Sequence, residues 1–182
     1  PRHSCLRDGN KLESSRMEKS SVMGHSRGPN SMDDEAQFMR RAIEIAERGR
    51  HRVMPNPLVG CVLVKDGKII AEGWHDHIGG LHAEQMAIAD AEAKGVATQG
   101  STAYVTLEPC NHFGRTPPCT EALLWAGVKR VVIGADDPNP TVRGEGTAAL
   151  VNSDIEVESG LLAEECNCLL YTSPSPRDEA LS

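Results

Sequence analysis

Residues 107–119 read LEPCNHFGRTPPC, so one cysteine follows a short apolar run and a second follows a pair of prolines. The run from Thr102 to Leu107 has the length and the apolar character of a buried strand. Pro117-Pro118 is a typical helix start signal, and we expect a helix from Cys119 to Trp125 that ends before Gly127. The stretch therefore predicts a strand, a loop and a helix, with a cysteine at each junction.

Outward from this stretch, helix and strand patterns alternate along the chain. Val59–Val64 and Lys68–Trp74 are strand-like runs joined by Asp66-Gly67, which is a strong hairpin signal. The further expected elements are helices at residues 33–48, 82–94 and 146–151 and strands at residues 128–133 and 155–157. A hairpin followed by repeated helix and strand units predicts an α/β fold, a three-layer α-β-α sandwich around a mixed five-stranded sheet.

The chain of 182 residues has the length of one domain. Residues 1–31 are rich in Ser, Arg, Gly and Asn without a periodic apolar pattern, so we expect a disordered or non-native N-terminal extension. Met32 opens the first patterned segment, and we assign residues 32–165 to one folded domain. In residues 166–182 the pattern decays and a Ser/Pro run follows, which indicates a truncated, non-native tail.

Charge and composition exclude several classes of protein. The net charge is -7, and residues 1–31 hold six Lys or Arg against three acids, which leaves thirteen against twenty-three in the remainder. Because an acidic domain has no general attraction to a polyanion, we expect no nucleic-acid partner. No apolar run approaches the roughly 18 residues of a membrane span. Six cysteines with no signal-peptide pattern favour a reducing, cytoplasmic setting, where paired thiols often bind metal.

His82-Ala83-Glu84 supplies the residues that complete a metal site with the two cysteines. One histidine and two thiolates are three zinc ligands, and a catalytic zinc site with three protein ligands leaves its fourth position to water. Cys119 opens a helix, whose N-terminus lowers the pKa of a thiol and favours the metal-binding thiolate. Two thiolates offset the charge of the zinc, so its water needs a nearby base. Glu84, two residues from His82, is placed to be that base.

A His-x-Glu motif with a later Pro-Cys and Cys pair is the signature of zinc nucleobase deaminases. We therefore expect His82, Cys110 and Cys119 to bind Zn²⁺ and Glu84 to transfer protons in a hydrolytic deamination. Eight residues separate the two cysteines here, where the generic signature has two. Two alternatives remain open: the cysteines form a disulfide or are unrelated thiols, or His112 completes a structural zinc site with four protein ligands.

Four segments together resemble one protein family. They are residues 55–60 (PNPLVG), 82–84 (HAE), 107–119 and 137–140 (DPNP), within a similarity that extends from about residue 32 to 165. The sequence resembles the deaminase domain of the bifunctional riboflavin biosynthesis proteins of the RibD family. The long insert between the cysteines is the specific part of this resemblance, because tRNA adenosine deaminases and most cytosine deaminases keep the two cysteines close together.

The resemblance implies a cytidine deaminase-like fold and a hydrolytic reaction on a small phosphorylated pyrimidine. The substrate would be 2,5-diamino-6-(5-phospho-ribosylamino)pyrimidin-4(3H)-one, and the products 5-amino-6-(5-phospho-ribosylamino)uracil and ammonia. In this reaction a water activated by zinc attacks the amine-bearing ring carbon while Glu84 carries its proton. The resemblance also implies self-association into a homo-oligomer, and it implies a substrate pocket lined by Asn56, His75, His112, Arg115 and Asn139.

Arg115 is the residue that we expect to contact the phosphate, because a guanidinium suits bidentate recognition of anions. The sequence departs from the family at Leu81, where a proline or another small residue is common, and at its end, where we expect no reductase domain. Two other functions remain open. One is deamination of a free base or nucleoside such as cytosine, guanine or cytidine. The other is a zinc-stabilised binding module whose partner contacts residues 1–31.

Overall fold

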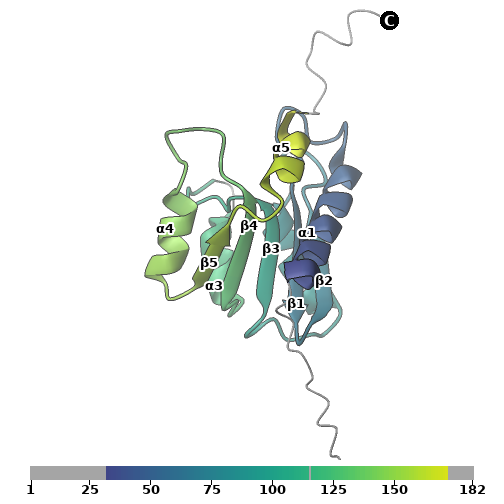
Figure 1. Cartoon of the computed structure of the whole chain (residues 1–182), viewed down its shortest axis with the longest axis vertical. Coiled ribbons are helices and arrows are strands. Elements are labelled where there is room, and N and C mark those ends of the chain that lie inside the picture. Colours follow the sequence, from purple (N-terminus) through teal and green to yellow (C-terminus); the bar gives the residue numbers. More distant parts are fainter. Residues whose placement is uncertain (1–31, 115, 172–182) are drawn as a thin grey trace, which may run out of the picture.

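The computed structural model describes residues 32–114 and 116–171 (Figure 1). Its helices are α1 (Met32–Ala46), the 3-10 helix η1 (Glu47–Gly49), α2 (Ala83–Ala93), α3 (Cys119–Trp125), α4 (Glu145–Asn152) and α5 (Ala163–Tyr171). Its strands are β1 (Gly60–Lys65), β2 (Lys68–Trp74), β3 (Thr102–Leu107), β4 (Arg130–Ala135) and β5 (Glu156–Ser159). The expected N-terminal extension at residues 1–31 and the end of the expected tail, residues 172–182, lie outside the described residues.

The five strands form one mixed sheet in the order β2-β1-β3-β4-β5. β1 pairs antiparallel with β2 and with β3, whereas β3 with β4 and β4 with β5 are parallel pairs. Figure 1 shows α1 and α5 in front of the sheet, and residues of α2, α3 and α4 share a core with the opposite face. The arrangement confirms the three-layer sandwich and the mixed five-stranded sheet expected from the sequence.

Alternation along the strands divides the core between the two faces of the sheet. In β1, Cys61 and Leu63 pack with residues of α2, α3 and α4, whereas Val62 and Val64 pack with Met39 and other residues of α1. β3 and β4 are buried on both faces over nearly their whole length. Their continuous apolar sequences follow from this position, because a central strand has no face toward water.

Helix α2 lies close to the sheet because its contact face consists of small residues. Ala83, Ala87 and Ala91 are fully buried, and Gly73 of β2 places no side chain between strand and helix. A Cβ atom at Gly73 would collide with the backbone of α2 at Ala83 and Ala87. This close packing fixes the position of the N-terminus of α2, which begins directly after His82.

Most element boundaries agree with those expected from the sequence to within two residues. Asp66 and Gly67 both have positive φ, 50° and 71°, as a tight hairpin turn requires. The C-terminal end differs: α5 continues to Tyr171, and Cys166 and Leu169 are buried in the core. The boundary expected at residue 165 therefore falls inside a helix, because the buried side chains of α5 make residues 166–171 part of the packed fold.

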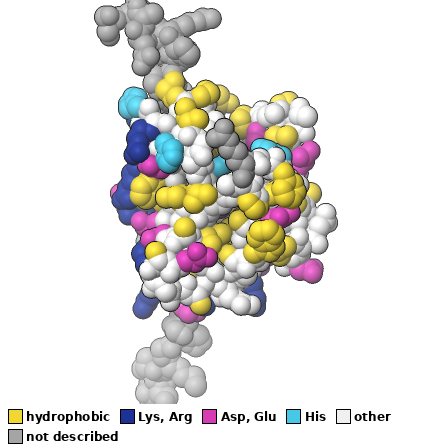
Figure 2. Space-filling view, turned by 180° about the vertical axis from the view of Figure 1, so that it is seen from behind, with side chains coloured by type: hydrophobic (Ala, Val, Ile, Leu, Met, Phe, Trp, Pro, Cys, Tyr) yellow, Lys and Arg dark blue, Asp and Glu magenta, His cyan; other side chains and the backbone are white. Residues whose placement is uncertain are grey.

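The side of the sheet covered by α2 and α3 carries hydrophobic side chains at its surface. Figure 2 shows them gathered across the middle of this face. Val96, Leu124 and Trp125 are among the large hydrophobic residues exposed to solvent, Trp125 to 70%. Among the helices of the described ranges, none has both the length and the apolar character needed to cross a membrane.

Candidate metal centre and active site

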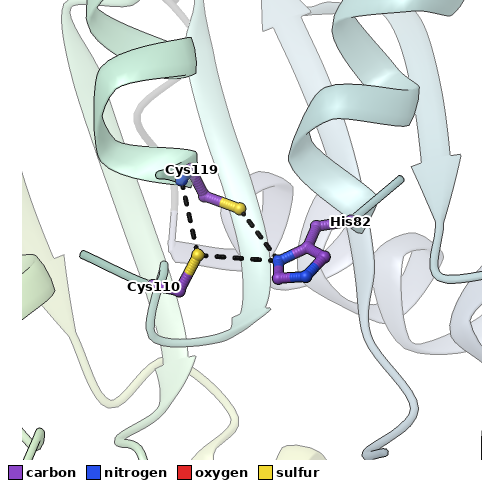
Figure 3. Close-up of side chains that lie close together, drawn as sticks. All are labelled: His82, Cys110 and Cys119. Carbon is purple, nitrogen blue, oxygen red and sulfur yellow. Dashed lines mark hydrogen bonds between the residues drawn. The ribbon is translucent and has the colours of Figure 1, made fainter. Parts of the chain in front are cut away.

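Three side chains with metal-binding atoms meet at one edge of the sheet (Figure 3). His82 directly precedes α2, Cys110 follows β3, and Cys119 is the first residue of α3. The Nδ1 atom of His82 lies 3.6 Å from the Sγ atom of Cys110 and 3.2 Å from the Sγ atom of Cys119. All three ligand atoms lie within 4.8 Å of one another. The fold thus brings together the three residues that the sequence predicts as metal ligands.

The spacing of these atoms fits a tetrahedral metal ion. Bonds of about 2.0–2.1 Å from zinc to nitrogen and about 2.3 Å to sulfur place neighbouring nitrogen and sulfur ligands about 3.6 Å apart at a tetrahedral angle. The two distances from Nδ1 of His82, 3.2 and 3.6 Å, are close to this value. The residues present therefore fit a zinc ion in size and in the chemistry of the donor atoms.

The two alternatives for the cysteines are not supported by this geometry. Cys110 and Cys119 are free cysteines, so no disulfide joins them. His112 is exposed and does not belong to the His82, Cys110 and Cys119 group, which is the one such group in residues 32–114 and 116–171. Three protein ligands leave one tetrahedral position for water or substrate, as in catalytic sites.

A single side chain connects the segments that carry His82 and Cys119. The Oε1 atom of Gln85 accepts a hydrogen bond of 3.2 Å from the backbone N–H of His82. Its Nε2 atom donates one of 2.9 Å to the carbonyl oxygen of Pro117, two residues before Cys119. The backbone N–H of Cys119 in turn donates to the Sγ atom of Cys110 at 3.4 Å. These hydrogen bonds therefore fix the position of the start of α2 relative to Pro117 and Cys119.

Glu84 is the buried carboxyl group of this site. It is 3% exposed, belongs to the first turn of α2 and lines the same cavity as His82 and Cys110. Burial raises the pKa of Glu84 to about 6, because a carboxylate loses its hydration in the protein interior. A group with this pKa exchanges protons near neutral pH, which is the property that general acid–base catalysis needs.

The two thiols of the site influence each other. A hydrogen bond from Cys119 and a further one with His82 hold the pKa of the Cys110 thiol well below its usual value. The same bond to Cys110, together with burial, raises the pKa of Cys119. The bond to Cys110 and burial therefore outweigh the lowering of the Cys119 pKa that its place at a helix N-terminus predicts.

A cavity of about 260 Å³ is lined by His82 and Cys110, two of the three predicted ligands, and Asn56 and His75 also contribute to its wall. The Nδ2 atom of Asn56 lies 3.3 Å from Nε2 of His75, whose Nδ1 lies 3.1 Å from the carbonyl oxygen of Leu81. These partners fit the neutral imidazole that carries its proton on Nδ1. Because Leu81 takes part through its backbone, its unusual side chain leaves this contact intact.

The other predicted pocket residues have different positions. His112 lines the cavity from the insert between the cysteines. Asn139 is exposed, and its side-chain oxygen accepts a hydrogen bond of 3.1 Å from the backbone N–H of Thr141, a common turn contact. It is not among the residues that line the cavity. Arg115 lies outside the described residues, so its phosphate contact stays a prediction.

The cavity wall also contains two acidic residues that the sequence motifs do not single out, Glu108 and Asp137. Glu108 directly follows β3, and Asp137 comes two residues after the end of β4. These strands are parallel neighbours, so their carboxyl ends meet at the same edge of the sheet. Their position after adjacent parallel strands is the one sequence signal for them, because ligand sites in such sheets form at these ends, but it does not distinguish them from ordinary acidic loop residues.

Comparison with known proteins identifies the family. Residues 32–135 match the family model described as the cytidine and deoxycytidylate deaminase zinc-binding region. Riboflavin biosynthesis protein RibD of Actinobacillus pleuropneumoniae is 53% identical over 132 residues, which are 72% of this chain and 34% of the relative. The diaminohydroxyphosphoribosylamino-pyrimidine deaminase of Buchnera aphidicola subsp. Acyrthosiphon pisum is 52% identical over 128 residues, 70% of this chain and 85% of the relative.

Solved structures give the same result for the fold. The crystal structure of a diaminohydroxyphosphoribosylaminopyrimidine deaminase/5-amino-6-(5-phosphoribosylamino)uracil reductase from Thermotoga maritima superposes with a TM-score of 0.73 at 53% identity, and the match covers 76% of this chain and 39% of that one. The chain thus spans about a third of the length of the RibD relative and most of the Buchnera relative. The chain belongs to the cytidine and deoxycytidylate deaminase family, among the diaminohydroxyphosphoribosylaminopyrimidine deaminases.

Proposed function

We propose that the chain is a zinc-dependent deaminase of riboflavin biosynthesis. Its reaction hydrolyses 2,5-diamino-6-(5-phospho-ribosylamino)pyrimidin-4(3H)-one to 5-amino-6-(5-phospho-ribosylamino)uracil and ammonia. The observation that carries this proposal is the buried Glu84 in a cavity whose wall also includes His82 and Cys110, two residues of the His82, Cys110 and Cys119 group. The Buchnera relative, of which the chain covers 85%, is named for this deaminase.

The roles of the residues follow from the chemistry of hydrolytic deamination. Zinc held by His82, Cys110 and Cys119 would supply the Lewis acid that makes water nucleophilic near neutral pH. A carboxylate oxygen of Glu84 accepts one proton of this water as the water oxygen bonds to the amine-bearing ring carbon, and then passes this proton to the ring nitrogen. Glu84 transfers the second proton to the amine nitrogen, the carbon–nitrogen bond breaks, and ammonia leaves a ring carbonyl behind.

The proposed substrate contacts divide between the base and the phosphate. Asn56 and His75 line the same cavity as Glu84, which supports the proposal that their polar atoms contact the pyrimidine ring. His112 lines the cavity from the insert, and Arg115, three residues further on, is proposed to bind the phosphate because its guanidinium suits an anion. Asn139, in the loop after β4, does not line the cavity, and its proposed contact with the substrate rests on the family resemblance alone.

A second candidate is deamination of another base or nucleotide, because the matching family model is described by cytidine and deoxycytidylate. A panel of the phosphorylated diaminopyrimidine, cytosine, guanine, cytidine and deoxycytidylate separates the two, with ammonia release as the measurement. We expect kcat/KM to be higher for the phosphorylated diaminopyrimidine by about a hundredfold or more, since buried polar groups left unpaired penalise the wrong substrate. Comparable turnover of cytidine or deoxycytidylate contradicts the proposed substrate.

A binding module rather than an enzyme gives a different result in the same assay. Deletion of residues 1–31 should leave ammonia release unchanged, because every described site residue lies between residues 56 and 139. No ammonia from any compound of the panel, together with a binding partner that depends on residues 1–31, favours the binding module.

Replacement of Gln85 by alanine tests how the metal site is held together. The change removes the hydrogen bonds to His82 and Pro117 but leaves every metal ligand in place. We expect the zinc affinity to fall about tenfold, the lower end of the range for residues that orient metal ligands. The measurement is the equilibrium competition for zinc between the protein and a coloured chelator.

Gln37 is the matched control, because it is an exposed glutamine on α1, on the opposite face of the sheet. Gln37→Ala should retain the zinc affinity of the wild-type protein. Equal zinc affinities of Gln85→Ala and wild type would show that the bridge does not contribute to the metal site.

Self-association and the cellular compartment belong to the same proposal. Self-association follows from the family resemblance, and the molar mass in solution from light scattering measures it. We propose a reducing, cytoplasmic setting, which suits the free thiols of Cys61, Cys110, Cys119 and Cys166.

A further inference from the structure

Glu108 is a buried carboxylate. It is not one of the proposed metal ligands, and it transfers no proton in the proposed reaction. It is 6% exposed and lies between the end of β3 and Pro109-Cys110. Its Oε2 atom accepts hydrogen bonds from the backbone N–H groups of Asp137 at 3.4 Å and Gly144 at 3.0 Å. Its Oε1 atom accepts one from the N–H of Thr147 at 3.1 Å. One side chain therefore binds three backbone donors.

The two donors to Oε2 are the ends of a loop. Residues 137 and 144 bound the loop between β4 and α4, and a single carboxylate oxygen holds both of them. Within the loop, the carbonyl oxygen of Asn139 accepts hydrogen bonds from the N–H groups of Val142 and Arg143. Glu108 thus closes the 137–144 loop at its base.

The donor to Oε1 belongs to the first turn of α4. The first N–H groups of a helix lack partners within the helix and need an acceptor from elsewhere. Gly144, which precedes α4, has no side chain to provide one. Glu108 takes this place, and its negative charge also suits the positive end of the helix dipole. The helix is capped from a different strand rather than by its own sequence.

The charge state of Glu108 agrees with this role. Burial alone would raise the pKa of Glu108, but the hydrogen bonds from the backbone at Gly144, Thr147 and Asp137 outweigh it and hold the pKa below its usual value. The group is therefore an ionised carboxylate, and hydrogen bonds to an ionised acceptor are stronger than those between neutral groups.

Packing places the same region directly against the metal side of the cavity. A Cβ atom at Gly146 would collide with the carbonyl oxygen of Pro109, so the start of α4 contacts the residue before Cys110. Asp137 and Glu108 both line the cavity. Residues 108 and 109 therefore set the distance between Cys110 and the 137–144 loop.

We propose that Glu108 is a positioning residue that fixes the 137–144 loop relative to the metal ligands and thereby determines how tightly the substrate is bound. It acts through the backbone of Asp137 and Gly144 rather than through the reacting atoms. The substrate part of this proposal rests on the proposed deamination of the phosphorylated pyrimidine. The structural part, a loop held by one carboxylate, is measurable without any substrate.

Glu108→Gln is the test variant, because it keeps the shape of the side chain but replaces one acceptor oxygen with an NH₂ donor. In either orientation of the amide, one oxygen remains for three N–H groups. We expect KM for the phosphorylated diaminopyrimidine to rise about tenfold or more, with kcat within about threefold of wild type and one zinc retained per chain. The backbone amides of residues 137–147 should exchange hydrogen about ten to a hundred times faster, as expected for the loss of a charge-assisted hydrogen bond.

Two further variants keep the test decisive. Glu108→Asp retains the charge and both oxygens on a shorter side chain, so it should recover part of the protection of residues 137–147. Glu35→Gln alters another buried carboxylate, which pairs with Arg130 at the opposite end of β4 at 2.6 Å, and it should leave KM and the exchange of this loop unchanged.

The outcomes separate this proposal from the proposed function. Unchanged hydrogen exchange at residues 137–147 in Glu108→Gln overturns the positioning role, as does a fall in kcat at constant KM. If the wild-type protein releases no ammonia from the phosphorylated diaminopyrimidine, the proposed function fails, and the exchange experiment still decides whether Glu108 holds the loop.

Discussion

Glu84→Gln is expected to lower kcat for ammonia release by about 10²- to 10⁴-fold, the contribution of a general acid–base group. The amide has the shape of the carboxyl group but cannot accept a proton from water and pass it on. Because Glu84 is not one of the three residues whose ligand atoms cluster, the variant should still bind one zinc per chain. Steady-state ammonia release and elemental analysis of the same preparation give the two numbers.

Glu72→Gln is the control for this experiment. Glu72 of β2 forms a salt bridge with Arg41 at 2.7 Å and is not among the residues that line the cavity. Its replacement should leave kcat close to the wild-type value. A Glu84→Gln protein that keeps more than about a tenth of the wild-type kcat with full zinc content contradicts the proton-transfer role.

Cys119→Ala is expected to abolish stoichiometric zinc binding and ammonia release together. Cys119 is fully buried at the start of α3, and its Sγ atom lies 3.2 Å from Nδ1 of His82. Zinc at about 1,000 times its Kd stabilises a protein by about 4 kcal/mol, which corresponds to roughly ten degrees in Tm for a chain of this size. Added zinc should therefore raise the Tm of the metal-free wild-type protein and leave that of Cys119→Ala unchanged.

Cys166→Ala provides the matched comparison, because Cys166 is also a buried free thiol but belongs to α5, on the other face of the sheet. This variant loses the same sulfur atom and should keep both zinc binding and the zinc-dependent rise in Tm. If Cys119→Ala still binds zinc with the wild-type affinity, Cys119 is not a ligand.

The sequence predicted those parts of the fold that depend on local patterns. A continuous apolar run indicated the strand at 59–64, because β1 is buried on both faces. Pro117-Pro118 marked the start of α3 because prolines suit a first helical turn. β4 begins at Arg130 rather than at residue 128 because Val128 is buried in the core ahead of the strand. An apolar side chain indicates burial, but it does not distinguish a strand residue from a packed loop residue.

The proposed metal ligands and Glu84 could be singled out in the sequence because their chemistry restricts the residue types. Asp137 and Glu108 could not, since an acidic residue in a loop has many ordinary roles. The contacts of Glu108 reach residues 29 to 39 positions away, and a local sequence pattern does not encode such distances. For the same reason, the link from Gln85 to Pro117, 32 positions apart, became visible only in the folded chain.

The order of the ligands along the chain has a consequence for folding. His82 is 28 residues from Cys110 and 37 from Cys119, whereas the two cysteines are only 9 apart. In the unfolded chain, a metal bound by both cysteines closes a short loop, and recruiting the histidine closes a much longer one at an additional entropic cost. The three ligands come together only when the segments before α2, after β3 and at the start of α3 have reached their folded positions. Tight metal binding therefore requires a folded chain.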